Sequence, residues 1–233
     1  MIRDTIKKLL PKSALGALAA RFYRPRASYS GGGEDMVINE LFKSKKDGFY
    51  VDIGCFHPLV ASNTYLLHAR GWHGINIDAD DYKIALFDRS RKRDRNICVA
   101  VSDTEGEAEF YFHTGESYGS MSSLVKSEAQ KKAQRLGREI RSRKVKTMPL
   151  RDILSREGVT SVDLLTIDVE GAEELVLSTI NFAAIDIDLI AVEIHGDIGH
   201  INGCPVNAIL TRNGYEIVAW TPPTVFYRRA GSE

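Results

Sequence analysis

Apolar residues along this chain gather in short runs separated by polar, helix-favouring stretches. The clearest runs are 49–53 (FYVDI), 74–78 (GINID), 97–101 (ICVAV), 162–168 (VDLLTID) and 188–194 (DLIAVEI). Short, nearly continuous apolar runs are typical of strands buried on both faces of a parallel sheet. The intervening stretches with the apolar spacing of short helices are 34–42, 62–69, 82–91, 150–157, 172–178 and 206–213.

Alternating strands and helices indicate successive βαβ units, which place helices on both faces of a mostly parallel sheet. The last two predicted strands, 215–220 and 224–228, are separated only by Thr221-Pro222-Pro223. That linker is too short for a helical crossover, so the final strand is predicted to run antiparallel to its neighbour. The sequence therefore predicts an α/β fold with a seven-stranded sheet and a C-terminal antiparallel strand.

The chain divides into two predicted parts. Residues 1–32 form a basic N-terminal helical segment and a flexible linker, and residues 33–233 form one domain. Within the domain, residues 104–148 are a lid-like insertion, called the insertion below. It is expected to hold a strand over 107–112, a hydroxyl-rich loop over 117–123, a basic helix over 127–143 and an extended stretch over 145–148.

Composition narrows the class of protein. With 43% hydrophobic and 27% charged residues, the chain has the composition of an ordinary globular protein. Because its net charge is zero, no overall electrostatic attraction to nucleic acid is expected. Its three cysteines are widely spaced, which argues against a disulfide framework and favours a reducing, cytoplasmic location. Residues 1–30 carry seven Lys/Arg against Asp4 alone. Contact of that segment with a membrane surface, which would make the protein peripheral, is left open beside the plainer expectation of a packed helix.

Acidic residues end four of the predicted strands: Asp52, Asp78, Asp168 and Glu193. In an open α/β sheet, ligands bind at the carboxyl ends of the strands, so four carboxylates there indicate a binding site. Gly54 lets the backbone approach a ligand, and an acid 24 residues further on, Asp78, is placed to bind the hydroxyls of a ribose. A single glycine is a weak signal, because a dinucleotide fingerprint has three.

Several short motifs, taken in order, are more specific. They are Gly33-Glu34-Asp35, GFYVDIGCFHP (48–58), Ser62-Asn63-Thr64, GWHGINID (71–78), AVSD (100–103), DLLTIDVEG with Ala172-Glu173 (163–173) and Val192-Glu193. Through these motifs the chain resembles the FkbM family of methyltransferases from about Gly33 to Arg228. The resemblance implies a Rossmann-like methyltransferase fold, S-adenosylmethionine as cofactor, and O-methylation of a sugar, glycan or other hydroxylated small molecule.

The resemblance also implies roles for individual residues. Asp52 and Gly54 would lie beside the methionine part of the cofactor, and Asp78 would bind the ribose. Ser102 and Asp103 would border the adenine, and Asp168 would lie near the sulfonium and the acceptor. Glu34 and Asn63 complete the expected cofactor-binding set. His57-Pro58 departs from the family pattern, since many relatives have a further glycine there.

A hydroxyl acceptor must lose a proton, and the candidate catalytic residues for that task are Asp168, Glu170 and His195. Asp168, Glu193 and His195, with Glu170, are also candidate ligands of a divalent cation, although no cation is expected. The basic run over 126–146 makes the insertion a candidate lid that favours an anionic acceptor, or simply a solvated helix. Without interleaved aromatic residues it does not indicate nucleic acid.

Two other functions remain open at this point. One is a nicotinamide-dependent oxidoreductase, against which the single glycine and the closing hairpin count. The other is a non-catalytic module that binds a glycan or a partner protein, against which the intact Asp52, Asp78 and Asp168 set counts. The oligomeric state cannot be read from the sequence, and a homodimer is consistent with it.

Overall fold

A computed structural model describes residues 27–114 and 122–231 of the chain. Most of the basic N-terminal segment, and most of the hydroxyl-rich loop of the insertion, lie outside the described residues. The prediction of an N-terminal helix and of its contact with a membrane surface therefore falls outside them as well. Over the described ranges, no helix combines the length and the apolar character needed to cross a bilayer.

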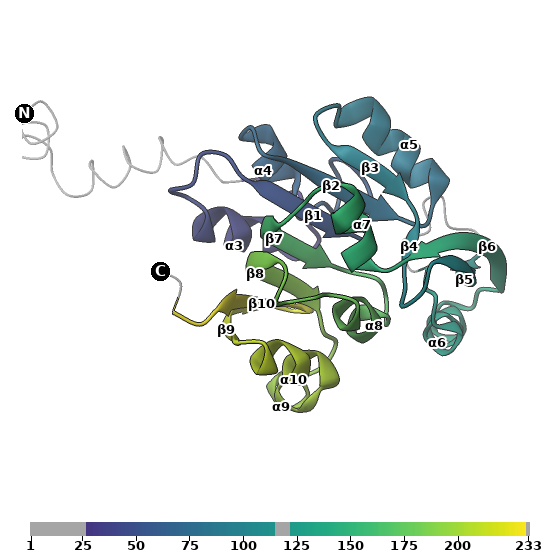
Figure 1. The fold of residues 1–233 in the computed structure, drawn as a ribbon. Helices are drawn as coiled ribbons and strands as arrows, with labels where there is room; N and C mark the ends of the chain where they lie inside the picture. Colours follow the sequence, from purple (N-terminus) through teal and green to yellow (C-terminus); the bar gives the residue numbers. More distant parts are fainter. Residues whose placement is uncertain (1–26, 115–121, 232–233) are drawn as a thin grey trace, which may run out of the picture.

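The described domain is organised around a seven-stranded sheet in the order β3-β2-β1-β7-β8-β10-β9 (Figure 1). The strands are β1 (Phe49–Ile53), β2 (His73–Asp78), β3 (Arg95–Cys98), β7 (Ser161–Ile167), β8 (Asp186–Glu193), β9 (Tyr215–Thr221) and β10 (Thr224–Arg229). Among the strand pairings of this sheet in the described residues, only those of β10 with β8 and with β9 are antiparallel. The predicted mostly parallel sheet with an antiparallel closing strand is confirmed.

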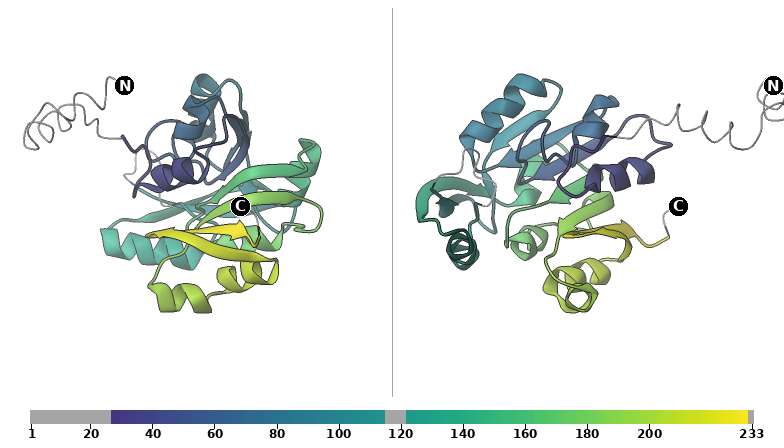
Figure 2. Two further views of the ribbon diagram at one scale, coloured as in Figure 1. Left: turned by 90° about the vertical axis from the view of Figure 1, so that its left-hand side faces the viewer. Right: turned by 180° about the vertical axis from the view of Figure 1, so that it is seen from behind.

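Helices cover both faces of the sheet, as predicted (Figure 2). The helices are α3 (Glu34–Leu41), α4 (Tyr65–Ala69), α5 (Asp81–Ser90), α7 (Leu150–Arg156), α8 (Glu173–Ser178), α9 (Ile198–Gly203) and α10 (Pro205–Arg212). Side chains of α3 and α4 pack with Tyr50 and Leu164 on one face, whereas α7, α8 and α10 pack with Val51 and Ile53 on the other. Alternate residues of β1 thus enter different cores, because successive side chains of a strand point to opposite faces.

The prediction of a single strand over 97–101 was wrong. Residues Arg95–Cys98 form β3 at the edge of the main sheet, and Ala100–Val101 form a separate strand, β4. Val99 still donates a backbone hydrogen bond to the Asp78 carbonyl, but the next two residues pair with Thr147 and Met148. The chain changes sheets here because its backbone finds a new partner in the insertion.

The predicted helix over 127–143 was also too long. Helix α6 (Lys126–Leu136) ends at Gly137, which has the left-handed conformation (φ 62°) of a helix C-cap. The following residues form β6 (Ile140–Met148), which pairs antiparallel with β5 (Gly106–His113) and parallel with β4 in a small second sheet. The pairing of β5 with β6 overrides the helical propensity of this polar stretch. Helix α9 was not predicted.

The register of the main sheet brings its strand ends together. Ile53 pairs with Ile77 of β2 and with Ile167 of β7, and Ile167 pairs with Val192 of β8. The residues that follow these positions therefore emerge side by side at one edge. That edge carries Gly54, Asp78, Asp168 and Glu193, as the strand-end argument predicts.

Candidate functional site

A cavity of about 180 Å³ opens at the carboxyl edge of the sheet. One end is formed by the strand ends of β1 and β7, with Gly54, Asp168 and Glu170, and the other by Asp78 and Ala79 after β2. Residues of the insertion close it from the side, namely Phe110 of β5, Ser122 and Leu124. The insertion thus forms part of the site rather than an appendage.

Gly54 stands where β1 and β7 come closest. Its φ is 81°, and a Cβ atom at this position would lie 1.7 Å from the backbone oxygen of Asp168. No side chain fits between the two strand ends, so glycine is required by packing as well as by its backbone conformation. The same feature leaves the floor of the cavity open at Gly54.

Asp52 lies behind the cavity rather than on its surface. It is buried, and its carboxylate accepts a hydrogen bond of 2.7 Å from the Thr64 hydroxyl. Burial raises the pKa of Asp52 to about 6 in spite of that hydrogen bond. Its contact with Thr64 ties the end of β1 to the end of the 54–64 loop, which we call the cofactor loop after the role that the sequence resemblance implies for it.

Asp78 faces the cavity and is paired with a lysine that the sequence analysis did not single out. The Lys83 ammonium, one turn into α5, lies 2.9 Å from Asp78 Oδ2, and the Asp80 backbone N–H donates to Oδ1 over 2.7 Å. Burial raises the pKa of Asp78, and the charge of Lys83 opposes that shift. A carboxylate has about four lone-pair sites, so two remain for further donors.

The far end of the cavity is apolar. Its surfaces are Ala79, the chain from Val99 to Val101, Phe110 and Leu124, which suit a flat aromatic ring. Ser102 and Asp103, predicted to border an adenine, do not line the cavity. The Ser102 hydroxyl donates to Asp103 Oδ1 (3.2 Å), and its backbone N–H donates to the Met148 carbonyl, so this pair turns the chain toward the insertion.

Asp168 and Glu193, called the acid pair below, lie on adjacent strand ends. Asp168 is exposed to the cavity although protein surrounds it, and only 12% of the Glu193 side chain is accessible. Burial, together with the charge of the neighbouring Glu193, raises the pKa of Asp168 well above its usual range. Burial also raises the pKa of Glu193. Two carboxylates in contact disfavour double ionisation, so the pair titrates as a unit.

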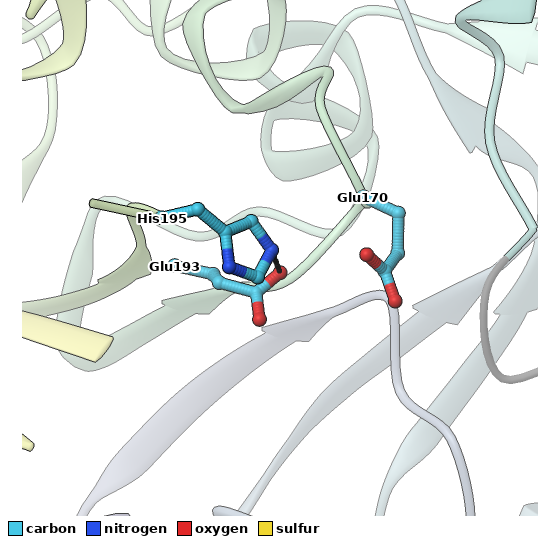
Figure 3. A group of neighbouring side chains, drawn as sticks. All are labelled: Glu170, Glu193 and His195. Atoms are coloured by element: carbon cyan, nitrogen blue, oxygen red, sulfur yellow. Dashed lines mark ion pairs between the residues drawn. The ribbon is translucent and has the colours of Figure 1, made fainter. Parts of the chain in front are cut away.

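Glu170, Glu193 and His195 converge at the mouth of this end (Figure 3). One ligand atom of each lies within 4.8 Å of the others, and His195 Nε2 is 3.4 Å from Glu193 Oε2. Asp168, also predicted as a ligand, contacts Glu193 but is not one of the three. The Lys132 ammonium of α6 forms an ion pair with Glu170. A divalent cation bound to Glu170 would compete with that ammonium for the carboxylate.

Lys132 joins the insertion to the acid pair. Its side chain is 15% accessible, and it interacts electrostatically with Glu193 and Asp168 as well as with Glu170. Helix α6 also packs tightly on the loop after β7, because a Cβ on Gly171 would lie 2.6 Å from the Cγ atom of Glu128. On the other side of the cavity, Arg143 of β6 forms ion pairs with Asp80 and Asp81.

The remaining predicted residues support the site from behind. Glu34 is buried and accepts a hydrogen bond from the Gly32 backbone, and its charge adds to the burial that raises the pKa of Glu193. Its neighbour Asp35 binds Ser28, Tyr29 and Ser30, so the Gly33-Glu34-Asp35 motif orders the chain before α3. Asn63 donates to the Thr166 hydroxyl over 3.3 Å.

The strand order, the closing antiparallel strand and a cavity at the carboxyl ends of β1, β2 and β7 define the Rossmann-like fold of methyltransferases. The sequence matches the model of the FkbM methyltransferase domain over residues 47–217. The chain therefore belongs to the FkbM methyltransferase family, whose members use S-adenosylmethionine. This finding confirms the predicted family and decides against the nicotinamide-dependent alternative.

The chain is similar to solved structures of methyltransferases at low sequence identity. A TehB-like S-adenosylmethionine-dependent methyltransferase from Corynebacterium glutamicum is 11% identical, with a TM-score of 0.44 over 93% of this chain and 95% of its own. A 1,6-didemethyltoxoflavin N1-methyltransferase from Burkholderia thailandensis, with bound S-adenosylhomocysteine, is 11% identical, with a TM-score of 0.43 over 84% of this chain and 76% of its own. A search of curated proteins finds no match.

Proposed function

We propose that the protein transfers a methyl group from S-adenosylmethionine to a hydroxyl oxygen of a sugar, a glycan or another hydroxylated small molecule. The acid pair carries this proposal. An acceptor at the mouth of the cavity would meet Asp168 directly, with Glu193 beside it. Carboxylates with raised pKa values are stronger bases than carboxylates with ordinary pKa values, which suits them to take the proton of a hydroxyl group.

The cavity fits the expected cofactor. The apolar end suits an adenine, and the two free lone-pair sites of Asp78 suit the hydroxyls of a ribose. The open floor at Gly54 leaves room for the methionine part, and the carboxylate of Asp168 would face the positively charged sulfonium. When bound, S-adenosylmethionine supplies the electrophilic methyl group.

The chain itself has two tasks in this reaction. The cofactor loop, Asp78 and the insertion hold the reactants in line, which is the main source of rate enhancement in a simple displacement. The acid pair accepts the hydroxyl proton as the new bond to oxygen forms. Glu170 and His195 lie at the same mouth, and we assign them to binding the acceptor.

The charge around the mouth bears on the nature of the acceptor. Lys131, Lys132 and Arg143 of the insertion are each engaged by a carboxylate. The proposal of an anionic acceptor thus rests on the remaining basic residues, and a neutral polyhydroxylated acceptor fits the acidic mouth better. The insertion remains the element that we expect to contact it.

Labelled S-adenosylmethionine and a panel of sugars, nucleotide sugars and lipid-linked glycans test the function by mass spectrometry. We expect transfer of label to an oxygen atom, located by fragmentation of the product. Asp168→Asn should lower kcat by about 10²- to 10⁴-fold, the usual contribution of a general base, while S-adenosylhomocysteine still binds. Label found only on nitrogen, or an Asp168→Asn variant with full activity, would overturn the proposal.

A further inference from the structure

Arg91 is a fully buried arginine whose guanidinium faces the back of the cofactor loop. It follows α5 and is 1% exposed. Its Nε and Nη2 atoms donate to the Pro58 carbonyl over 3.1 and 2.7 Å, and Nη2 also donates to the Ser62 hydroxyl over 2.8 Å. Nη1 donates to the Thr64 hydroxyl over 2.7 Å and to the Tyr50 hydroxyl over 3.1 Å. Every nitrogen of the side chain is thus engaged.

The buried charge of Arg91 is balanced nearby. The carboxylate of Asp94, itself wholly buried, lies 3.9 Å from Nη1 and accepts hydrogen bonds from Tyr50 and from Asn76. The desolvation of a buried ion pair costs about as much free energy as the attraction between the charges gains. A net gain in stability is therefore a poor explanation for this network. What it does supply is a fixed fork of donors, which lysine could not provide.

The residues that Arg91 holds and those that line the cavity belong to the same loop but are different residues. Pro58, Ser62 and Thr64 face the guanidinium, whereas Gly54, Phe56 and Ala61 line the cavity. The guanidinium therefore supports the inner surface of the cofactor loop from behind. Within the His57-Pro58 dipeptide, which stands in place of a second glycine, the guanidinium binds the Pro58 carbonyl, and the His57 ring accepts hydrogen bonds from the Leu59 and Val60 backbone.

Ala61 shows that the loop is under constraint. Its φ is 49°, a left-handed conformation that costs a residue with a Cβ atom roughly 1–2 kcal/mol. The next residue, Ser62, is fixed twice, by Arg91 at its hydroxyl and by the Tyr29 carbonyl at its backbone N–H (2.9 Å). The strained residue is thus held against the cavity by contacts on its neighbour.

Thr64 transmits the same constraint to β1. Because its hydroxyl oxygen accepts the hydrogen bond from Arg91, its single proton is free to point to Asp52 Oδ2. The guanidinium thereby orients both ends of the cofactor loop.

We propose that Arg91 is a positioning residue of the cofactor site, which holds residues 54–64 in the conformation that receives the methionine part of S-adenosylmethionine. The proposal rests on the cofactor site described above. It predicts that the loss of Arg91 affects one end of the ligand and not the other, because the adenosine end is bound by Asp78 and the apolar surfaces.

Two ligands separate this role from a general effect on folding. S-adenosylhomocysteine carries the amino-acid part, and 5′-methylthioadenosine lacks it. By calorimetry, Arg91→Met is expected to bind S-adenosylhomocysteine at least tenfold more weakly than the natural protein, with affinity for 5′-methylthioadenosine changed less than about twofold. Arg91→Lys should restore little, since the fork is lost. In turnover, the KM for S-adenosylmethionine should rise while kcat is largely kept.

Arg93→Met is the matched control. Arg93 lies two residues away, is exposed and donates to the His68 carbonyl instead of the cofactor loop, so both affinities should stay unchanged. Should Arg91→Met fail to fold, Ser62→Ala removes one acceptor only and should still weaken S-adenosylhomocysteine selectively, by a few-fold. Equal loss for both ligands, or no loss, would overturn the role of Arg91. Natural protein that binds neither ligand would instead overturn the cofactor site.

Discussion

The Lys83 ammonium lies 2.9 Å from Asp78 Oδ2, with 6% of each side chain accessible to solvent. Burial raises the pKa of this carboxylate at the end of β2, and the charge of the lysine opposes that shift and so favours the ionised form. The ionised form accepts hydrogen bonds only, and hydroxyl groups are the donors that a ribose offers. The pair is therefore buried at the cavity rather than a surface ion pair, and we propose that it binds the ribose.

Asp78→Ala is expected to weaken the binding of S-adenosylhomocysteine by about 10- to 100-fold, since a hydrogen bond to a charged group contributes roughly 1.5–3 kcal/mol. Calorimetry on the purified variant measures the change. Asp81→Ala provides the control, because that side chain is 80% accessible and pairs with Arg143 on the surface. Unchanged affinity in Asp78→Ala would mean that the ribose assignment is wrong.

The acid pair predicts a shift in the pH dependence of turnover. The charge of Glu193 raises the pKa of Asp168, so Glu193→Gln should lower that pKa. Because the base must be ionised, activity falls as pH drops through the pKa, and the variant should keep its activity to lower pH than the natural protein. The measurement is kcat against pH. Glu174→Gln on the exposed side of α8 should leave the profile in place; a Glu193→Gln profile that also stays there would count against coupling.

Asp52 predicts a pH-dependent stability. Its pKa of about 6 in the folded protein exceeds that of an exposed aspartate, so its destabilising effect is absent below about pH 4 and complete above its folded pKa. Asp52→Asn keeps an acceptor for Thr64 and removes the charge. Relative to the natural protein, the variant should gain about 2–3 kcal/mol of unfolding free energy between pH 4 and pH 8, measured by urea denaturation. A difference that does not vary with pH would contradict this reading.

Metal dependence follows from the place of Lys132. Its ammonium is paired with Glu170, which is one of the three candidate ligands of a cation beside Glu193 and His195. Turnover is therefore expected to be unaffected by EDTA and by added Mg²⁺ or Mn²⁺. Loss of activity on chelation, restored by either ion, would show that a cation replaces the lysine during the reaction.

The sequence predicted best those features that depend on the residues of a single strand. The acids of the site were found because β1, β2 and β7 end in register, so that Asp78 and Asp168 emerge beside Gly54. The break in the strand over 97–101 was not predicted, because it depends on a distant partner. Ala100 leaves the main sheet to pair with Thr147, more than 40 residues away. Local pattern carries no information about such a partner.

The supporting side chains were missed for a related reason. Lys132, Lys83 and Arg91 lie on helices or helix ends, in charged stretches that look like solvated surface. They reach the site through long side chains whose direction depends on how α5 and α6 pack. Gly137 is a local signal in the sequence that the helix of the insertion ends before residue 143, since a left-handed glycine ends an α-helix.

Gly54 offers a test of how closely the fold and the site are joined. Gly71→Ala measures the cost of a left-handed conformation by itself, because Gly71 has φ 106° and open space where its Cβ would lie. That cost is about 1–2 kcal/mol. Gly54→Ala adds a clash with the backbone oxygen of Asp168, which only a separation of β1 from β7 would relieve.

Such a separation would break the hydrogen bond from the Asp168 N–H to the Ile53 carbonyl (3.0 Å) and move Asp168 away from the cavity. We expect Gly71→Ala to fold and bind S-adenosylhomocysteine normally, with a slightly lower Tm. Gly54→Ala should lose several times more unfolding free energy and its ligand binding together. Thermal denaturation and calorimetry on the two variants compare them directly. Equal stability in both would show that β7 yields at Asp168 without cost, and that the close approach of the strands does not set the geometry of the site.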